Sequence, residues 1–239
     1  GRSMSREETD LVDECAICLS ACTSSSSEGR SLVRKFHDDS GFGFNDISMQ
    51  ALNSHSAKAR RHFSEVVGHL YEDHALWTDS PGSFSVSDWI EITGLKNMAT
   101  ICTKTLGTMF EPSFVLGEVH GAAFLGSQCV RALRLAETRN EQDADDGISD
   151  CWTACADIVS LLGKGLAHPD AAIGNACSRA IVIAFSYDGQ DAPNLNKKLF
   201  DAVAIALGKM NASLKKFSSI DHADANRSES LIEASGLLL

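Results

Sequence analysis

The feature that most constrains the fold is a helical pattern of apolar residues that recurs along the chain between short breaks. It is clearest at residues 157–185, where one amphipathic segment ends at His168-Pro169-Asp170 and a second begins directly after it. Proline followed by aspartate is typical of a helix N-terminus, because proline fits the first turn and aspartate caps free N–H groups. Sustained alternation of apolar and polar residues, which marks a half-buried strand, is not found in the sequence. The pattern predicts an all-α fold.

Caps and breaks set the ends of the expected helices. Ser5 and Glu8 form a capping box at the start of the first helix, and Gly94 interrupts a later helical run. Residues 180–185 are apolar throughout and compatible with a buried strand, but the Pro169-Asp170 start favours a helix. The sequence predicts helices at 5–22, 32–36, 46–52, 54–74, 87–110, 114–138, 149–166, 170–185, 195–217 and from 228 onward.

Composition divides the chain into four stretches. Residues 1–44 combine helices with flexible loops such as the serine-rich 23–29, and residues 141–148 form an acidic linker. Residues 45–140 and 149–239 carry the paired helical pattern, which makes them the expected repeats. The chain stops within an uncapped apolar pattern, so we expect it to be a fragment of a larger protein, truncated at the C-terminus.

The hairpin at residues 157–185 has the residue types of a known repeat. Its first helix is rich in leucine, its turn contains Pro169 and Asp170, and its second helix has small residues on one face. The apolar and small positions are Leu161, Leu162, Leu166, Ile173, Ala176, Cys177, Ala180 and Ile181. The hairpin resembles a HEAT repeat, although Gly174 stands where that family often has arginine. In HEAT repeats, small residues on the second helix let consecutive hairpins stack closely.

Further segments resemble the same repeat. They lie at 53–71, where Ala59-Arg60 falls at the branched-arginine site, and at 114–133, while 231–237 resembles the beginning of another copy. A spacing of about 40 to 60 residues suits HEAT arrays. The resemblance to the HEAT and armadillo-like repeats implies an α-solenoid of helical hairpins in a right-handed superhelical array.

A finer resemblance involves Phe114-Val-Leu-Gly-Glu118, followed by small residues, an acidic insertion and a hairpin with a His-Pro turn. This order is similar to a segment of the long HEAT-repeat scaffolds that adapt the proteasome to other cell machinery. The resemblance implies a non-enzymatic adaptor that binds the proteasome in the cytoplasm, and also in the nucleus. It maps no partner-binding residue onto this chain.

The charge balance narrows the class of partner. The chain carries 21 Lys and Arg against 32 Asp and Glu, a formal net charge of −11. Nucleic acids and anionic lipid surfaces attract positive fields, so we expect neither as a partner. No apolar stretch approaches the ~20 residues of a membrane span. Because glycine motifs for phosphate binding or a nucleophilic serine are also missing, we expect protein partners, no cofactor, no small-molecule substrate and no catalytic residue.

Eight cysteines occur in apolar helical runs. Cys15, Cys18 and Cys22 are three and four residues apart, so they share one helix face, and Leu11 and Leu19 extend the apolar stripe. We expect these cysteines in the core, where a free thiol behaves as a small hydrophobe, and in a reducing compartment. The spacing of Cys15 and Cys18 also matches half of a zinc site, but no second pair follows at finger spacing.

Three histidines spaced by seven residues give the main alternative hypothesis. His55, His62 and His69, with Glu65 and Glu72 nearby, would place metal-ligating side chains on one helix face of a metal- or cofactor-binding enzyme. Such a site needs a ligand from another segment, which no spacing indicates. The competing interpretation is a solvated helix face.

Other functional classes fit less well. A nuclear transport-type solenoid would share the acidic charge, but a regular ladder of acidic or Trp and Asn residues on the second helices is not evident. A helical nucleic-acid-coating protein is opposed by the net charge of −11. The acidic tract 143–147 does not fit a calcium loop, because Ala144 and Thr153 fall at ligand positions.

Overall fold

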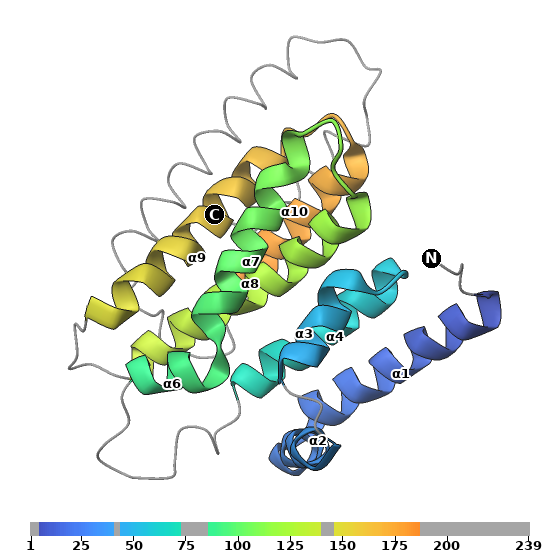
Figure 1. The fold of residues 1–239 in the computed structure, drawn as a ribbon, viewed down its shortest axis with the longest axis vertical. Coiled ribbons are helices and arrows are strands. Elements are labelled where there is room, and N and C mark those ends of the chain that lie inside the picture. The colour runs from blue at the N-terminus through green and yellow to red at the C-terminus, as the bar shows by residue number, and fades with distance from the viewer. Residues whose placement is uncertain (1–4, 41–43, 73–85, 140–145, 187–239) are drawn as a thin grey trace.

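The computed structural model describes residues 5–40, 44–72, 86–139 and 146–186 (Figure 1). All regular structure in these ranges is helical, which confirms the expected all-α fold. The α-helices are α1 Arg6–Ser25, α2 Ser27–Ser40, α3 Phe44–Asn53, α4 Ala57–Tyr71, α6 Val86–Thr93, α7 Leu95–Gly107, α8 Leu116–Arg139, α9 Asp146–Gly165 and α10 Ala171–Phe185, and the 3-10 helix η1 is Thr108–Phe110. The helices expected at 195–217 and from 228 onward, and the repeat start at 231–237, lie outside the described residues.

The local signals at helix ends are confirmed. Ser5 Oγ accepts a hydrogen bond from the Glu8 backbone N–H at 3.2 Å, and the Glu8 carboxylate accepts one from the Ser5 N–H at 2.7 Å. Ser56 caps α4, and Asp170 caps α10 by accepting from a backbone N–H in its first turn. Gly94 separates α6 from α7 with φ of 64°, a left-handed conformation that glycine adopts without steric cost.

Two segments that were expected to be irregular contain helix. Helix α1 continues to Ser25, so that only Ser26 separates it from α2 within the predicted flexible loop 23–29. The serine hydroxyls there donate to main-chain carbonyls three residues earlier, a bond that is compatible with a continued helix. Helix α9 begins at Asp146, inside the segment 141–148 that was predicted as a linker.

Helix α8 lies at the centre of the packing and contacts α3, α4, α7, α9 and α10. Helix α1 packs on α4 at the edge of the molecule, where Figure 1 shows it in blue. Residues of α8 buried in the core are Val119, Ala122, Ala123, Phe124, Leu125, Cys129, Val130, Ala132, Leu133 and Ala136. Trp89 of α6 and Tyr71 of α4 are also fully enclosed, with ring centroids 6.2 Å apart in an edge-on contact. None of the helices in the described ranges is long and apolar enough to cross a membrane.

Candidate functional site

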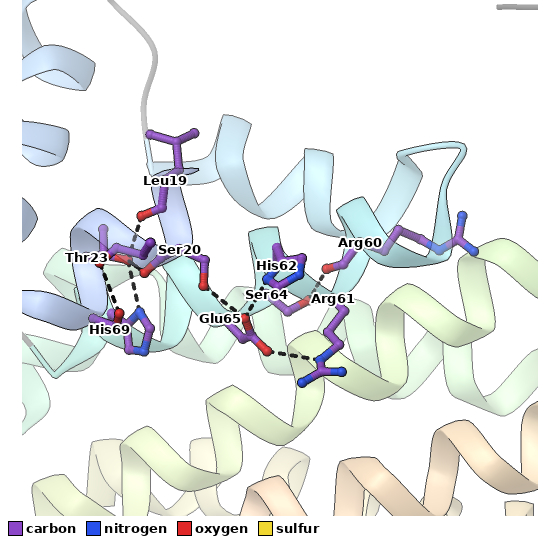
Figure 2. Close-up of polar contacts among 11 residues, drawn as sticks. Leu19, Ser20, Thr23, Arg60, Arg61, His62, Ser64, Glu65 and His69 are labelled. Atoms are coloured by element: carbon purple, nitrogen blue, oxygen red, sulfur yellow. Dashed lines mark hydrogen bonds and ion pairs between the residues drawn. The ribbon is translucent and has the colours of Figure 1, made fainter. Parts of the chain in front are cut away.

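The three histidines of the metal hypothesis do not share one site. His55 is exposed in the turn before α4, whereas His62 and His69 lie on α4 itself. His62 Nδ1 is 2.8 Å from Glu65 Oε2, and His69 Nδ1 is 2.9 Å from Thr23 Oγ1 of α1 (Figure 2). Both histidines on α4 are therefore engaged at the interface between α1 and α4.

Glu65 is the centre of a polar network between these two helices. Its carboxylate accepts hydrogen bonds from Ser20 Oγ at 2.9 Å and Arg61 Nε at 3.0 Å, in addition to the His62 contact (Figure 2). Burial raises the pKa of Glu65, but the Ser20 hydrogen bond and the charges of His62 and Arg61 together outweigh it, so the pKa lies below its usual value. We call the set Ser20, Thr23, Arg61, His62, Glu65 and His69 the α1–α4 seam.

Arg60 points away from the seam and closes the turn between α3 and α4 (Figure 2). Its guanidinium donates to the carbonyl oxygens of Ser54 and, at 3.0 Å, His55. The residue is only 8% exposed, and burial lowers its pKa. A Cβ on Gly117 would lie 3.2 Å from the Arg60 guanidinium, so the start of α8 packs directly on it. Arg60 therefore connects the α3–α4 turn to α8.

The remaining carboxylate of the metal hypothesis is directed to another helix. Glu72 Oε1 lies 3.2 Å from Arg131 Nη2 of α8. Within residues 5–40, 44–72, 86–139 and 146–186, no group of three or more His, Cys, Asp or Glu side chains is placed to hold a metal ion. In the described helices, the arrangement of His62, Glu65 and His69 attaches α1 to α4.

The prediction that Cys15, Cys18 and Cys22 lie in the core is wrong, because all three are exposed. Helix α1 instead buries a narrow face of small residues, including Ser20 and Thr23 of the seam. Ala16 lies in the core, and Val12 and Leu19 pack against it, whereas Ser20 and Thr23 form hydrogen bonds to α4 that a search for apolar periodicity does not detect. The expectation of buried thiols is confirmed for Cys102, Cys129, Cys151, Cys155 and Cys177.

Exposed apolar side chains gather at the turn between α7 and α8. Phe110, Val115 and Leu116 are 54%, 52% and 41% exposed, and Glu111 and Glu118 beside them in sequence are also exposed. We call these five residues the α7–α8 turn patch. Apolar surface with acidic neighbours fits a protein partner that offers apolar and basic side chains. In the sequence, the aromatic residues Phe110 and Phe114 lie on either side of this turn. The sequence alone does not show whether such a residue packs into the core or stays exposed to solvent.

An open hollow of about 440 Å³ lies along α6 and α7, next to the bend at Gly94. It is lined by Ser87, Ile90, Glu91, Gly94, Lys96, Asn97 and Thr100. Glu91 and Lys96 bring opposite charges to it, and Lys96 Nζ also pairs with Asp150 of α9 at 2.8 Å. The hollow can accept a polar side chain or a small polar molecule, but it has few of the apolar walls typical of enclosed ligand sites.

Comparison with known proteins assigns no role to these surfaces. No family model matches the chain, and neither a curated protein nor a solved structure matches it.

Proposed function

We propose that the chain is a non-enzymatic protein-interaction scaffold, folded as an α-solenoid of HEAT-like hairpins. The observation that carries this proposal is the pairing of the helices: α3 packs on α4, α7 on α8, and α9 on α10. The helices α4 and α10 both pack on α8, and α7 packs on α9, as two rows of stacked hairpins would require. Hairpins stacked in two rows are the arrangement of an α-solenoid, which leaves a broad surface free for partners.

Small residues allow the second helices to approach their neighbours closely. A Cβ on Gly121 of α8 would lie 2.6 Å from the carbonyl oxygen of Ala51 at the end of α3. On α10, the small residues Ala176, Cys177 and Ala180 are buried, and this helix packs on α8. These contacts support a HEAT-like stack, because the repeat requires small side chains at such positions.

The α7–α8 turn patch is the surface that we propose for partner binding. It includes the end of the Phe114–Glu118 segment that resembles the proteasome-adapting HEAT scaffolds. The proteasome is therefore the first assembly to test, in the cytoplasm or the nucleus. The net charge of −11 favours partners with basic surface, chiefly by increasing the association rate.

A direct binding experiment tests this proposal. The immobilised chain is mixed with purified proteasome, and the retained fraction is compared with that of a Phe110→Ser/Leu116→Ser variant. We expect the variant to bind at least about tenfold more weakly, because a few apolar side chains carry most of an interface's binding energy. The matched control is Leu32→Ser, since Leu32 on α2 is 68% exposed and lies outside the patch.

The outcomes separate the scaffold proposal from the choice of partner. If the proteasome is not retained but another purified assembly binds through the patch, the scaffold proposal stands and the proteasome hypothesis fails. If binding to every assembly is unchanged in the Phe110→Ser/Leu116→Ser variant, the patch is not the binding surface.

A further inference from the structure

Three exposed thiols form a row along α1. Cys15, Cys18 and Cys22 are exposed, whereas Ala16 on the same helix is fully buried. At about 100° per residue, the row points about 130° around the helix axis from Ala16. Helix α1 lies at the edge of the molecule and packs on α4 (Figure 1). The thiol row is therefore directed away from that interface and open to solvent.

The helical spacing of the row is too wide for a disulfide bond but suits a bridging ion. Residues three or four apart on a helix have Cβ atoms about 5–6 Å apart. A disulfide brings its Cβ atoms to about 3.8 Å, so closing one within α1 would distort the helix. Two sulfur atoms that bind the same metal ion, each at about 2.3 Å, lie up to about 4.6 Å apart, which their Cβ atoms can span without moving the backbone.

The number of ligands available indicates which ion fits. Zinc takes four ligands in structural sites, whereas among the described residues no group of three or more suitable side chains is placed to hold an ion. Thiolates also select Cu(I), a soft ion that is stable between two sulfur atoms in line. We propose that Cys18, together with either Cys15 or Cys22, binds one Cu(I) ion as a two-coordinate bis-thiolate.

The binding step involves no change of oxidation state. Each participating thiol releases its proton to solvent as its sulfur bonds to the ion, so two protons leave and copper remains Cu(I). The buried cysteines compete poorly for the ion. Burial raises the pKa of the Cys177 thiol to about 12, for example, and the ion would have to enter the packed core to reach it.

Anaerobic titration of the full chain with Cu(I), in competition with the coloured chelator bicinchoninate, tests the site. The wild-type chain should withdraw one Cu(I) ion. Cys18→Ser removes both pairs and leaves thiols two turns apart, so the affinity should fall about 100-fold or more. Cys15→Ser and Cys22→Ser are the matched controls, because each leaves one pair intact, and each should lose only a few-fold in affinity.

Two further measurements check the geometry. X-ray absorption at the copper edge should show two sulfur neighbours per ion in the wild-type chain. The far-ultraviolet circular dichroism of all three variants should match the wild type, because the substituted side chains are exposed. Equal Cu(I) affinity in Cys18→Ser and wild type would overturn the proposal, and so would a single ion shared by two chains in a copper-dependent dimer.

Discussion

At the scale of single residues, Gly121 sets how closely α8 approaches α3. A Cβ there would lie 2.6 Å from the carbonyl oxygen of Ala51 and 2.7 Å from that of Leu52. Both are backbone atoms, which cannot rotate away as a side chain could, so Gly121→Ala must displace one helix. We expect the free energy of unfolding to fall by about 2 kcal/mol, as in other overpacked cores, measured by urea denaturation.

Gly107→Ala is the matched control for this substitution. A Cβ at Gly107 would meet no atom within 4 Å, and the φ of −58° is one that alanine adopts freely. We expect no loss, and a gain of about 0.5 kcal/mol because alanine restricts the unfolded chain. Equal losses at both positions would show that the contact with α3 is not the cause.

His120 of α8 makes stability depend on pH. Burial in the first place, and then the charges of Arg60 and Arg179, lower the pKa of His120 to about 4. In the unfolded chain the pKa is about 6.5, so between these two values the unfolded state binds a proton that the folded state does not. The contribution of His120 to stability should therefore decrease as the pH falls from about 6.5 to about 4, and stay constant below that.

Replacement by a ring that does not titrate tests this dependence. His120 packs on Phe124 with ring centroids 4.8 Å apart, and its Nδ1 has no hydrogen-bond partner within the described part of the chain. His120→Phe therefore keeps an aromatic ring and loses no hydrogen bond at that atom. Urea denaturation at several pH values should show a shallower decrease for the variant between pH 6.5 and 4. The same slope in both proteins would assign the dependence to other groups.

At the scale of helices, the α1–α4 seam attaches α1 by charge as well as by packing. Glu65→Gln keeps the shape of the side chain but removes its charge. We therefore expect the free energy of unfolding to fall by about 1–2 kcal/mol at pH 7. The pKa of Glu65 is lowered in the folded state, so its stabilisation is present above the unfolded value of about 4.3 and is lost as the pH falls through the folded value. Urea denaturation should therefore show the two proteins converging in acid.

Glu14→Gln is the control for the seam. Glu14 is also on α1, but its side chain is 68% exposed and lies 3.6 Å from Lys58 Nζ. Exposed ion pairs contribute little to stability, so we expect Glu14→Gln to change the free energy of unfolding by less than about 0.5 kcal/mol. A loss as large as that of Glu65→Gln would indicate that any charge removed from the interface has the same effect.

The turn between α9 and α10 is fixed to η1 by His168. Its Nδ1 accepts a hydrogen bond from the Asp170 N–H at 3.0 Å, so in the neutral ring Nε2 carries the proton and donates to the carbonyl oxygen of Met109 at 2.9 Å. The side chain is 5% exposed, and its ring lies 5.5 Å from the Phe110 ring and 5.7 Å from the Phe114 ring. One side chain thus joins two turns that are distant in sequence.

Removing the His168 ring should lower the free energy of unfolding by more than removing the Asp170 helix cap beside it. His168→Ala leaves the buried Met109 carbonyl without its donor and opens a cavity, so we expect a loss of about 3 kcal/mol in urea denaturation. Asp170→Ala removes only a cap, which costs about 1 kcal/mol. The reverse order would show that the turn depends on the cap and not on the contact with η1.

The sequence was sufficient for the features of this fold that are encoded locally. Ser5 and Asp170 were recognised as caps because each acts on the backbone within three residues of itself. The buried face of α1 was not predicted, because Ser20 and Thr23 are polar and their hydrogen-bond partners lie on α4. Those bonds connect residues that are 45 and 46 positions apart, and a periodic pattern contains no information about them.

The candidate site was predicted in part for the same reason. Helical spacing placed His62, Glu65 and His69 on one face of α4, and the structure brings His62 and Glu65 into contact while His69 contacts Thr23 of α1. Their partners on α1 are hydroxyl groups, which occur in every described helix and carry no distinctive spacing. The α7–α8 turn patch was missed because the exposure of Phe110 depends on how the turn docks, which is decided by distant residues such as His168.

At the scale of the whole molecule, α8 makes the described helices one unit. It packs on α3, α4 and α7, which precede it in sequence, and on α9 and α10, which follow it, so the core continues across every helix pair. In a stack of hairpins, each pair is stabilised mainly by its neighbours, and a pair without a neighbour exposes its stacking face. Separation of α3 and α4 from α8 should therefore destabilise both parts.

Division of the chain between Glu72 and Val86 tests this dependence. We expect residues 1–72 and 86–239, expressed separately, to show no cooperative thermal unfolding by circular dichroism, and to purify together when they are co-expressed, because α3 and α4 then pack on α8 again. Gly68→Leu should abolish co-purification, since a Cβ at Gly68 would meet the Gln128 side chain of α8 directly, whereas the exposed Lys58→Ala should have no effect. Two pieces that each unfold cooperatively on their own would show that the core divides between α4 and α8, and would contradict a continuous stack.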